Sequence, residues 1–480
     1  MTTSGYDVAI IGSGFSGSIL AWILAKQGRR VAIIDSSRHP RFAIGESSTP
    51  IADRILAKLG ERYGISELVS LSSYGSWQRD FPDLVCGKKR GFSYFDHRSG
   101  TDESHLGERS LLVAASPTDD RSDTHWLRSD VDAFLFRSAV DAGAVPMEGS
   151  RVTGLECDAP NRLWLSNDEA LVADVVIDAS GRGQFLRRMR RRVDLTHRLQ
   201  TKTRSSFAHF ENVGSFSDAF DERYSDRRGH EPFDADDAAQ HHLIDHGWVW
   251  MLRMNNGVTS VGVTTASWDI RHPTDVDLLT LFSNYPLLHS VMRQASLVAP
   301  DAGVTSIPRI QQLCDPILSK TCWMLPTTAF TLDPLHSTGI AHALVGVQRV
   351  AEILLENRGF SAVANYRKSL LREALLLDHL VAMAYRHTAS FERFTAACMV
   401  YFAAAIHSEE RMGAGEMPST LWLADDAAFR QALVDVSVLL ASPHSNTRVL
   451  REVAQLLQPW NTVGLLNPDA CNRYAYTATK

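Results

Sequence analysis

A glycine-rich segment near the N-terminus has the composition of a phosphate-binding turn. It reads GSGFSG, has glycines at 12, 14 and 17, and follows the apolar run YDVAIIG. Gly12 permits a tight turn, Gly14 lets the backbone approach a pyrophosphate, and Gly17 allows a helix to pack closely on a strand. The next apolar run ends at Asp35, where a carboxylate can bind a ribose hydroxyl. These four residues predict a dinucleotide site.

Three later segments favour FAD over NAD. RFAIGESSTP contains Ser47 and follows the second apolar run, Arg128 precedes a helical pattern, and VVIDASGRG ends a strand at Asp178. The small residues after Asp178 would allow the backbone to lie close to a cofactor. In order and spacing these segments resemble the FAD-binding elements of the flavoprotein monooxygenase superfamily. We therefore expect FAD, with Ser47, Arg128 and Asp178 among its binding residues.

Two tryptophans separated by one residue stand out later in the chain. Trp248 and Trp250 occur in HGWVWMLRM, and the period of two in a strand places both indoles on one face. Each buries about 200 Å² of surface. The pair is either a water-excluding wall beside a reactive site or ordinary core packing between a sheet and a helix.

Three segments together, RFAIGES, GWVWML and DPLHSTGI, resemble the flavin-dependent halogenases over about residues 5–400. The resemblance implies that reduced FAD from a separate flavin reductase, dioxygen and chloride or bromide yield hypohalous acid. In that family the acid travels through a tunnel to a lysine beside an electron-rich aromatic substrate, free or carrier-bound. The paired tryptophans lie along the wall between flavin and substrate.

The same resemblance implies roles for individual residues. The lysine is Lys89 in VCGKKRGFSYF, although Lys88 remains the alternative and both can belong to a solvated loop. Glu46 is a candidate for chemistry near the flavin, or is structural. The loop before the helix at STGI is implied to bind halide through Ser337, Thr338 and Gly339, and to contact the flavin through Thr327, Gly339 and Ile340.

Two departures from the family pattern affect these expectations. Pro326 and Thr327 stand where the superfamily usually has Gly-Asp, whose carboxylate holds a ribityl hydroxyl. Loss of that bond costs about 1.5–3 kcal/mol, which predicts weak or transient FAD binding. Arg253 replaces a proline after the tryptophans, and a cation there would suit an acidic or carrier-bound substrate.

Two other functions are compatible with the same motifs. One is a monooxygenase, dehydrogenase or geranylgeranyl-reductase-like enzyme that works without halide. The other is a catalytically degenerate protein that only binds flavin.

The elements that must position these residues follow from hydrophobic periodicity. The first 35 residues read strand–helix–strand, positions 200–320 are rich in strands, and the chain is mostly helical from STGI onward. We expect an α/β protein with a Rossmann-like FAD-binding fold, interleaved with a mostly antiparallel sheet that forms the substrate lobe, and a helical C-terminal region. The expected domains are 1–200 with 305–358 (FAD), 201–304 with parts of 70–125 (substrate), and 359–480 (helical).

Composition excludes several classes of protein. The 480 residues carry a formal charge of −6, which gives no reason to expect nucleic acid as a partner. The six cysteines form no C-x-x-C pair, which argues against a metal site and disulfides and favours a reducing compartment. The chain has no apolar run of about 18 residues, and its first strand leaves no room for a signal peptide. We expect a cytoplasmic protein without a membrane span, and a homodimer is possible.

Overall fold

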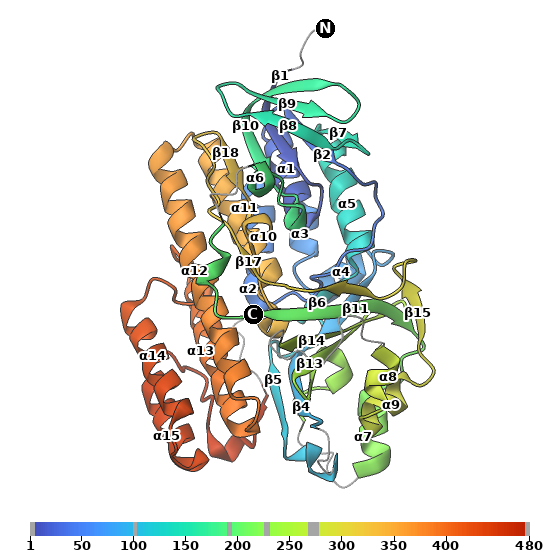
Figure 1. Cartoon of the computed structure of the whole chain (residues 1–480), viewed down its shortest axis with the longest axis vertical. Coiled ribbons are helices and arrows are strands. Elements are labelled where there is room, and N and C mark those ends of the chain that lie inside the picture. The colour runs from blue at the N-terminus through green and yellow to red at the C-terminus, as the bar shows by residue number, and fades with distance from the viewer. Residues whose placement is uncertain (1–4, 99–102, 190–193, 225–230, 267–277, 476–480) are drawn as a thin grey trace.

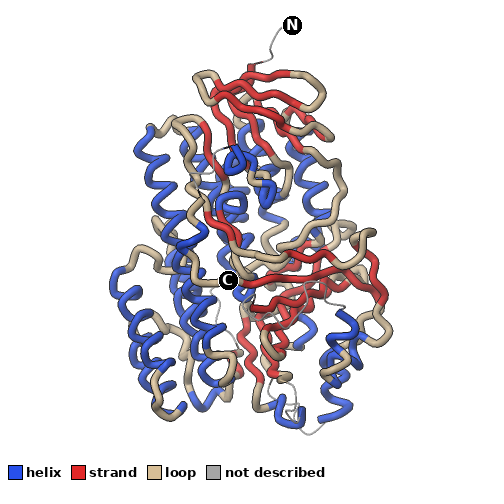
Figure 2. Tube along the Cα trace, in the orientation of Figure 1, coloured by secondary structure: helices blue, strands red, loops and turns tan. Residues whose placement is uncertain are grey.

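The computed structural model describes residues 5–98, 103–189, 194–224, 231–266 and 278–475. A mixed, mostly parallel sheet with its helices forms one end of the molecule, and a second sheet with a few short helices forms the other (Figure 1). Long C-terminal helices run along one side of both (Figures 1 and 2).

The first sheet is built on the predicted strand–helix–strand unit. Its strand order is β7-β2-β1-β10-β9-β8, with β18 also paired to β10. The strands are β1 (Gly5–Ile11), β2 (Val31–Asp35), β7 (Val145–Glu148), β8 (Val152–Glu156), β9 (Asn161–Leu165), β10 (Ala170–Asp178) and β18 (Cys322–Met324). Pairs β1–β2, β1–β10, β2–β7 and β10–β18 are parallel. The carboxyl ends of β1, β2 and β10 therefore meet at one edge, where ligands bind in open α/β sheets.

Helices cover this sheet and bring distant segments to it. The principal ones are α1 (Phe15–Lys26), α2 (Pro50–Tyr63), α5 (Arg128–Asp141) and α11 (Gly339–Leu355). Thr49 caps α2 by accepting a hydrogen bond from the backbone N–H of Ala52. In α1, the residues from Phe15 to Leu24 are all buried, because helices pack around it on several sides.

The second sheet is antiparallel except at two strand pairs. Its order is β15-β11-β14-β13-β12-β4-β5-β20, with β16 also paired to β11. The strands are β4 (Gly91–Asp96), β5 (Ser110–Ala114), β11 (Thr203–Glu211), β12 (Ala238–Ile244), β13 (Gly247–Arg253), β14 (Thr259–Ala266), β15 (Ser296–Ala299), β16 (Thr305–Ile307) and β20 (Arg473–Tyr474). Pairs β4–β12 and β5–β20 are parallel.

Alternation along β13 divides its side chains between two cores. Trp248, Trp250 and Leu252 belong to the main core, which the first sheet shares. Val249 and Met251 belong to a second core with residues of α7 (Phe216–Tyr224), α8 (Leu278–Phe282) and α9 (Pro286–Met292). The predicted common face of the two tryptophans is confirmed.

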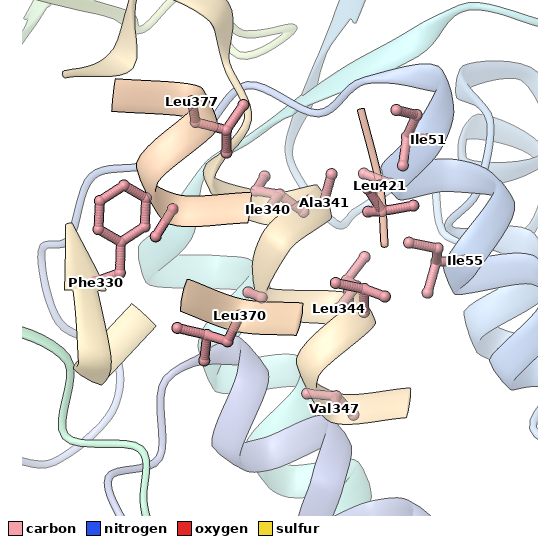
Figure 3. Close-up of a cluster of buried hydrophobic side chains, with 14 of the residues drawn as sticks. Ile51, Ile55, Phe330, Ile340, Ala341, Leu344, Val347, Leu370, Leu377 and Leu421 are labelled. Atoms are coloured by element: carbon pink, nitrogen blue, oxygen red, sulfur yellow. The ribbon is translucent and has the colours of Figure 1, made fainter. Parts of the chain in front are cut away.

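The remaining helices form the C-terminal layer, α12 (Phe360–Arg386), α13 (Phe391–Gly413), α14 (Ala427–Ala441) and α15 (Asn446–Leu457). Figure 3 shows side chains of α11 packed between those of this layer and those of α2. Ile340 and Leu344 of α11 lie in one buried cluster with Ile51 of α2 and Leu370 of α12. The C-terminal region is not entirely helical, because β20 returns to pair with β5.

Short elements complete the described structure. They are α3 (Ser66–Ser70), α4 (Tyr74–Asp80), α6 (Phe185–Met189), α10 (Pro326–Ala329), and the two-stranded sheets β3 (Cys86–Lys89) with β6 (Asp123–Trp126) and β17 (Gln312–Leu313) with β19 (Phe330–Thr331).

The predicted fold class is confirmed, since a Rossmann-type sheet, a mostly antiparallel sheet and a helical C-terminal layer are all present. One predicted boundary needs adjustment, because Thr305–Ile307 pairs with β11 of the second sheet and not with the first. In the ranges the structure describes, no helix combines the length and hydropathy that crossing a membrane requires.

Candidate active site

A cavity of about 580 Å³ lies where the edge of the first sheet faces the inner face of the second. It brings together most of the predicted site residues, which come from both sheets and from α11. The predicted residues in its lining are Gly12, Gly14, Asp35, Glu46, Ser47, Arg128, Trp248, Trp250, Thr327, Ser337, Thr338, Gly339 and Ile340. Gly17, Asp178 and Lys89 lie outside that lining.

The three glycines of the first turn differ in what surrounds them. Gly12 has φ +109°, and a Cβ there would lie 2.3 Å from the carbonyl oxygen of Ala179. A Cβ on Gly17 would lie 2.1 Å from the carbonyl oxygen of Gly12. At Gly14 the nearest atom to a Cβ would be Oδ2 of Asp132, 3.7 Å away. The turn itself therefore requires Gly12 and Gly17, whereas Gly14 keeps a cavity-lining surface open.

Asp35 is held in place at the end of β2. Its Oδ2 accepts hydrogen bonds of 2.8 Å from both the backbone N–H and the hydroxyl of Ser13 and of 2.9 Å from Arg41. Its Oδ1 accepts a 2.9 Å bond from the N–H of Ser37. The carboxylate is thus oriented before any ligand arrives, and a carboxylate oxygen can accept further bonds from a ribose hydroxyl.

Arg128 fastens the loop that precedes α2 to the start of α5. Its guanidinium makes two bonds of 2.8 Å to Asp132 and donates to the carbonyl oxygens of Ile44 (2.8 Å) and Gly45 (3.2 Å). It also lies 4.6 Å from the ring centroid of Phe15. Its position in the cavity wall is therefore rigid, and its charge is paired.

The carboxylate of Asp178, a predicted FAD-binding residue, lies outside the cavity lining. Its Oδ1 accepts from the N–H (3.0 Å) and hydroxyl (2.6 Å) of Ser180, and its Oδ2 accepts from the N–H of Leu186 at 2.8 Å. Burial raises the pKa of this carboxyl, against the effect of those bonds. The cavity is lined by the next residues, 179–182, so the strand end contributes its backbone while the carboxylate organises the following turn.

The Pro326–Thr327 departure has a structural basis. Pro326 is the first residue of α10, and its ring packs so closely on α11 that a Cβ at Gly346 would lie 2.2 Å from it. The hydroxyl of Thr327 lies 3.3 Å from that of Ser16, and both residues line the cavity. A neutral hydroxyl pair therefore stands where the superfamily has a carboxylate.

The two tryptophans belong to the core and also line the cavity. They are 2% and 7% exposed, with ring centroids 5.9 Å apart. The indole N–H of Trp248 donates to the hydroxyl of Tyr385 at 2.9 Å, and that of Trp250 donates to Ser260 at 3.2 Å. Space for the second indole exists because Gly262 faces it, where a Cβ would lie 2.2 Å from Trp250. The wall is thus apolar and fixed.

Asp333 also lines the cavity, although it is not among the predicted site residues. Its Oδ2 accepts 2.8 Å bonds from the hydroxyls of Tyr385 and Thr203, and its Oδ1 accepts from the N–H of Leu335 at 3.2 Å. Burial raises its pKa to about 6. It stands in the quoted segment DPLHSTGI, but its side-chain partners are far away in the sequence.

Arg253 lies away from the cavity, which overturns the expectation of a cation beside the tryptophans. As the third residue after Trp250 it points to the opposite face of β13. Its Nε is 3.1 Å from Asp236, and its Nη atoms donate to the carbonyl oxygens of Val213 and Gly214. It joins outer loops and has no access to a substrate in the cavity.

The two adjacent lysines of β3 point in opposite directions. Lys88 is partly exposed and forms ion pairs with Asp119 (2.7 Å) and Asp237 (2.8 Å). Lys89 is fully buried, and its ammonium group donates to the carbonyl oxygen of Ser48. The alternative that Lys88 is the functional lysine therefore loses its support, because its charge is already paired at the surface.

Lys89 stands behind the wall of the main cavity. Its Nζ is 3.9 Å from the ring centroid of Phe92. Phe92 in turn lines a second cavity, of about 20 Å³, with residues of α2 and α13. The other residues in this lining include Thr49, Pro50, Tyr401, Phe402 and Glu409.

Glu46 and the loop before α11 complete the predicted set. The Oε1 of Glu46 is 2.8 Å from Nε2 of His209, so this carboxylate is paired inside the cavity wall. Ser337 has φ +52°, and α11 begins two residues later at Gly339. The first N–H groups of a helix have no intrahelical acceptor and favour an anion, and here they face the cavity.

The residues present fit FAD. The glycine turn and the start of α1 can hold a pyrophosphate, the oriented carboxylate of Asp35 suits a ribose, and the cavity continues to the tryptophan wall. The hydroxyls of Ser16 and Thr327 can still bond a ribityl chain, without a charge.

Comparison with known proteins supports this interpretation. Residues 10–77 match a family model described as an NAD(P)-binding Rossmann-like domain. The chain is 30% identical over 353 residues to the tetracycline 7-halogenase of Kitasatospora aureofaciens, which is 70% of this chain and 61% of that protein. It is 29% identical over 363 residues to the monodechloroaminopyrrolnitrin halogenase of Pseudomonas fluorescens, 73% of this chain and 62% of that one. The chain thus spans about three-fifths of the length of these relatives.

Among solved structures, the crystal structure of a halogenase (PltM) in complex with phloroglucinol and FAD has the same fold. The TM-score is 0.86 at 23% identity, and the match covers 98% of this chain and 99% of that one.

Proposed function

We propose that this chain, which is similar to flavin-dependent halogenases, halogenates a free, electron-rich aromatic small molecule with reduced FAD, dioxygen and chloride or bromide. The proposal is supported above all by one arrangement. The dinucleotide-type glycine turn, the tryptophan pair and the 337–339 loop share a single cavity, and a buried lysine lies beyond its wall.

Dioxygen, activated by bound reduced FAD, would supply the oxidising equivalent that converts halide to hypohalous acid. The protein would contribute binding and exclusion of water. Gly14 leaves room for the pyrophosphate, Asp35 orients the ribose, and the first turn of α11 favours an anion beside Ser337–Gly339. Trp248 and Trp250 would keep the substrate away from the flavin, so that the oxidised halogen reacts in place of a direct hydroxylation.

Lys89 would receive the oxidised halogen and present it to the substrate. Its burial against the ring of Phe92 removes it from bulk water. Two relatives named for tetracycline and monodechloroaminopyrrolnitrin and the phloroglucinol bound to the structural neighbour favour a free aromatic substrate. A less similar relative, 25% identical, is named for a pyrrole on a peptidyl-carrier protein.

A separate flavin reductase is part of this proposal, because the sequence has one dinucleotide-type glycine motif. The six cysteines form no disulfide, which suits a reducing compartment such as the cytoplasm.

The test is bromination under defined conditions. The full chain is incubated with chemically reduced FAD, air, bromide and a panel of phenols, indoles and pyrroles, and products are identified by mass. Brominated products support the proposal, whereas hydroxylated products that do not depend on bromide would assign a monooxygenase.

Matched lysine variants make the test specific. Lys89→Met keeps the length of the side chain and removes the amine, so bromination should fall at least a hundredfold while FAD binding stays unchanged. Lys88→Met is the control and should retain activity, since Lys88 pairs with surface carboxylates. Equal activity of the two variants would remove Lys89 from the mechanism.

A further inference from the structure

A buried histidine separates the main cavity from the region of Lys89. His336 ends the 3₁₀ turn Pro334–His336 and is 1% exposed. Its neighbours in sequence, Asp333, Pro334, Ser337 and Thr338, line the main cavity. Its ring stacks on Tyr401 of α13, with centroids 4.3 Å apart and an interplanar angle of 3°. Since Tyr401 lines the second cavity, His336 lies in the wall between the two.

The polar atoms of His336 have no partner in the protein. Neither ring nitrogen makes a hydrogen bond within the described residues, although both are buried. Burial lowers the pKa of this imidazole to about 3, with a further contribution from His241. The ring is therefore neutral and offers one N–H donor and one acceptor nitrogen.

Burying an imidazole without hydrogen-bond partners is energetically unfavourable. Buried polar atoms are almost always hydrogen-bonded, and a phenylalanine would fill the same stack on Tyr401 without the cost of desolvating two nitrogens. The hydroxyl of Tyr94 shows the same pattern, since it is buried without a partner in the described residues while its ring stacks 4.4 Å from His241. The ring nitrogens of His336 are thus suited to a small polar guest.

Aromatic contacts connect His336 to Lys89. Tyr401 lies 5.3 Å from Phe402, and Phe402 lies 5.2 Å from Phe92, between ring centroids. The ammonium of Lys89 sits 3.9 Å from the centroid of Phe92. A small molecule that leaves the main cavity for Lys89 along these rings meets mostly carbon surface. His336 is a polar side chain at the start of this path, close to His241 of the cavity lining.

We propose that His336 binds hypohalous acid on its way from the main cavity to Lys89, through hydrogen bonds at its two ring nitrogens. Hypohalous acid is small and uncharged, with one O–H donor and an oxygen acceptor, which matches a neutral imidazole. Binding there would lower the chance that the acid diffuses back to solvent. The inference rests on the proposed halogenase function and names the residue that would keep the oxidised halogen on its path.

The experiment measures where the oxidised halogen goes. His336→Phe keeps the stack on Tyr401 and removes both nitrogens, whereas His336→Gln keeps a donor and an acceptor. Each is given reduced FAD, air, bromide and a phenol accepted by the unaltered protein, with a thiol scavenger in solution. We expect brominated product per FAD oxidised to fall about tenfold in His336→Phe, the scale of a lost hydrogen bond. The hypobromous acid trapped outside should rise, and His336→Gln should recover part of the product.

A second buried histidine supplies the control. His242 of β12 is fully buried and bonds to His97 at 3.0 Å, but it packs in the second core, with Phe216, away from the cavity. His242→Phe should leave the product-to-scavenger ratio unchanged even if its melting temperature drops.

Other outcomes would overturn the inference. If His336→Phe keeps the ratio of the unaltered protein, the histidine only packs. If His336→Phe alters flavin quenching or the KM for bromide but leaves the product-to-scavenger ratio unchanged, then His336 acts on flavin or halide binding. If the unaltered protein oxidises reduced FAD but brominates nothing, the proposed function fails, and this inference with it.

Discussion

A methyl group added at each glycine of GSGFSG would either make ordinary contacts or clash with the backbone. Gly14→Ala should fold normally, because the nearest atom to its Cβ would be 3.7 Å away, but the methyl group would occupy the surface that a pyrophosphate approaches. FAD affinity should drop at least tenfold, measured by quenching of flavin fluorescence, with the melting temperature changed little.

Gly17→Ala is the matched comparison. Its Cβ would lie 2.1 Å from the carbonyl oxygen of Gly12, so α1 must shift away from β1, and overpacking of this kind costs about 1–3 kcal/mol. We expect a lower melting temperature in this variant. Equal effects of Gly14→Ala and Gly17→Ala on stability would contradict the assignment.

Asp333 should make stability depend on pH in a defined window. Its folded pKa is raised by burial from 3.8 to about 6, so between about pH 4 and 6 the folded state holds a proton that the unfolded state has lost. The contribution of Asp333 to the free energy of unfolding is therefore highest below pH 4 and falls as the pH rises to 6. Above pH 6 it stays lower by about 3 kcal/mol, which corresponds to a pKa shift of that size.

The measurement compares Asp333→Asn with the unaltered protein by thermal melts from pH 4 to 8. Asparagine does not titrate. The difference in melting temperature, Asp333→Asn minus the unaltered protein, should therefore increase up to about pH 6 and then level off. A difference that stays constant over this range would show that the carboxyl does not titrate there.

Site residues could be predicted where their partners are near in sequence. GSGFSG and Asp35 belong to one strand–helix–strand unit, so residue type and spacing determine their arrangement. The bonds of Asp178 to the turn that follows it could not be predicted, because a carboxylate at a strand end has the same sequence pattern whether it contacts a ligand or the next turn. His336 could not be selected at all, since the lack of a hydrogen-bond partner is visible only in three dimensions.

At the scale of elements, a buried charge cluster fixes the C-terminal layer to α11. Glu373 of α12 accepts bonds of 2.9 and 2.7 Å from Arg349 of α11 and one of 2.8 Å from the N–H of Leu421. Burial alone would raise the pKa of Glu373, but Arg349 and His342 outweigh it and lower the pKa to about 2. One carboxylate thus holds three segments together.

Glu373→Gln should therefore destabilise the protein by about 3–5 kcal/mol, because it leaves the guanidinium of Arg349 without its countercharge. Glu352→Gln is the control, since Glu352 pairs with the partly exposed Arg62 and such pairs contribute about 0–1 kcal/mol. Urea unfolding measures both. A double variant, Arg349→Leu with Glu373→Leu, should lose less than Glu373→Gln, and a larger loss would refute the charge argument.

The element patterns of the sequence were informative where periodicity is local. The period of two in GWVWML placed both indoles on one face and, read one residue further, would have placed Arg253 on the other. Strand register was not accessible in the same way. Gly262 faces Trp250 across β13 and β14, and a glycine in GVTSVGVTT gives no sign that it makes room for an indole.

On the scale of the whole molecule, the cavity lies between two sheets whose strands interleave along the chain. Turns of the first sheet hold the predicted dinucleotide-binding residues, the second sheet supplies the tryptophan wall, and α11 closes the space between them. The family resemblance could predict this assembly because it concerns a complete fold. Local patterns could not, since pairings such as β18 with β10 join residues about 145 positions apart.

Strand β20, near the end of the chain, belongs to the second sheet and not to the helical layer. β20 pairs with β5, Arg473 donates to the carbonyl oxygens of Ser110 (3.1 Å) and Gly107 (3.0 Å), and the hydroxyl of Tyr474 accepts from the N–H of Leu466. A chain that stops at Cys471 loses these contacts, so its helical layer should melt earlier and be cut faster by a protease.

FAD binding should survive this truncation, because every residue that lines the main cavity precedes residue 343. Bromination activity should decrease more than FAD binding does, because Tyr401 and Glu409 of α13 line the second cavity. We expect flavin quenching within about twofold of the full chain and a clearly lower yield of product at the same temperature. A truncated chain that loses flavin affinity but keeps its melting temperature would mean that the C-terminal layer supports the cofactor directly, and the separation of roles drawn from the cavity walls would be wrong.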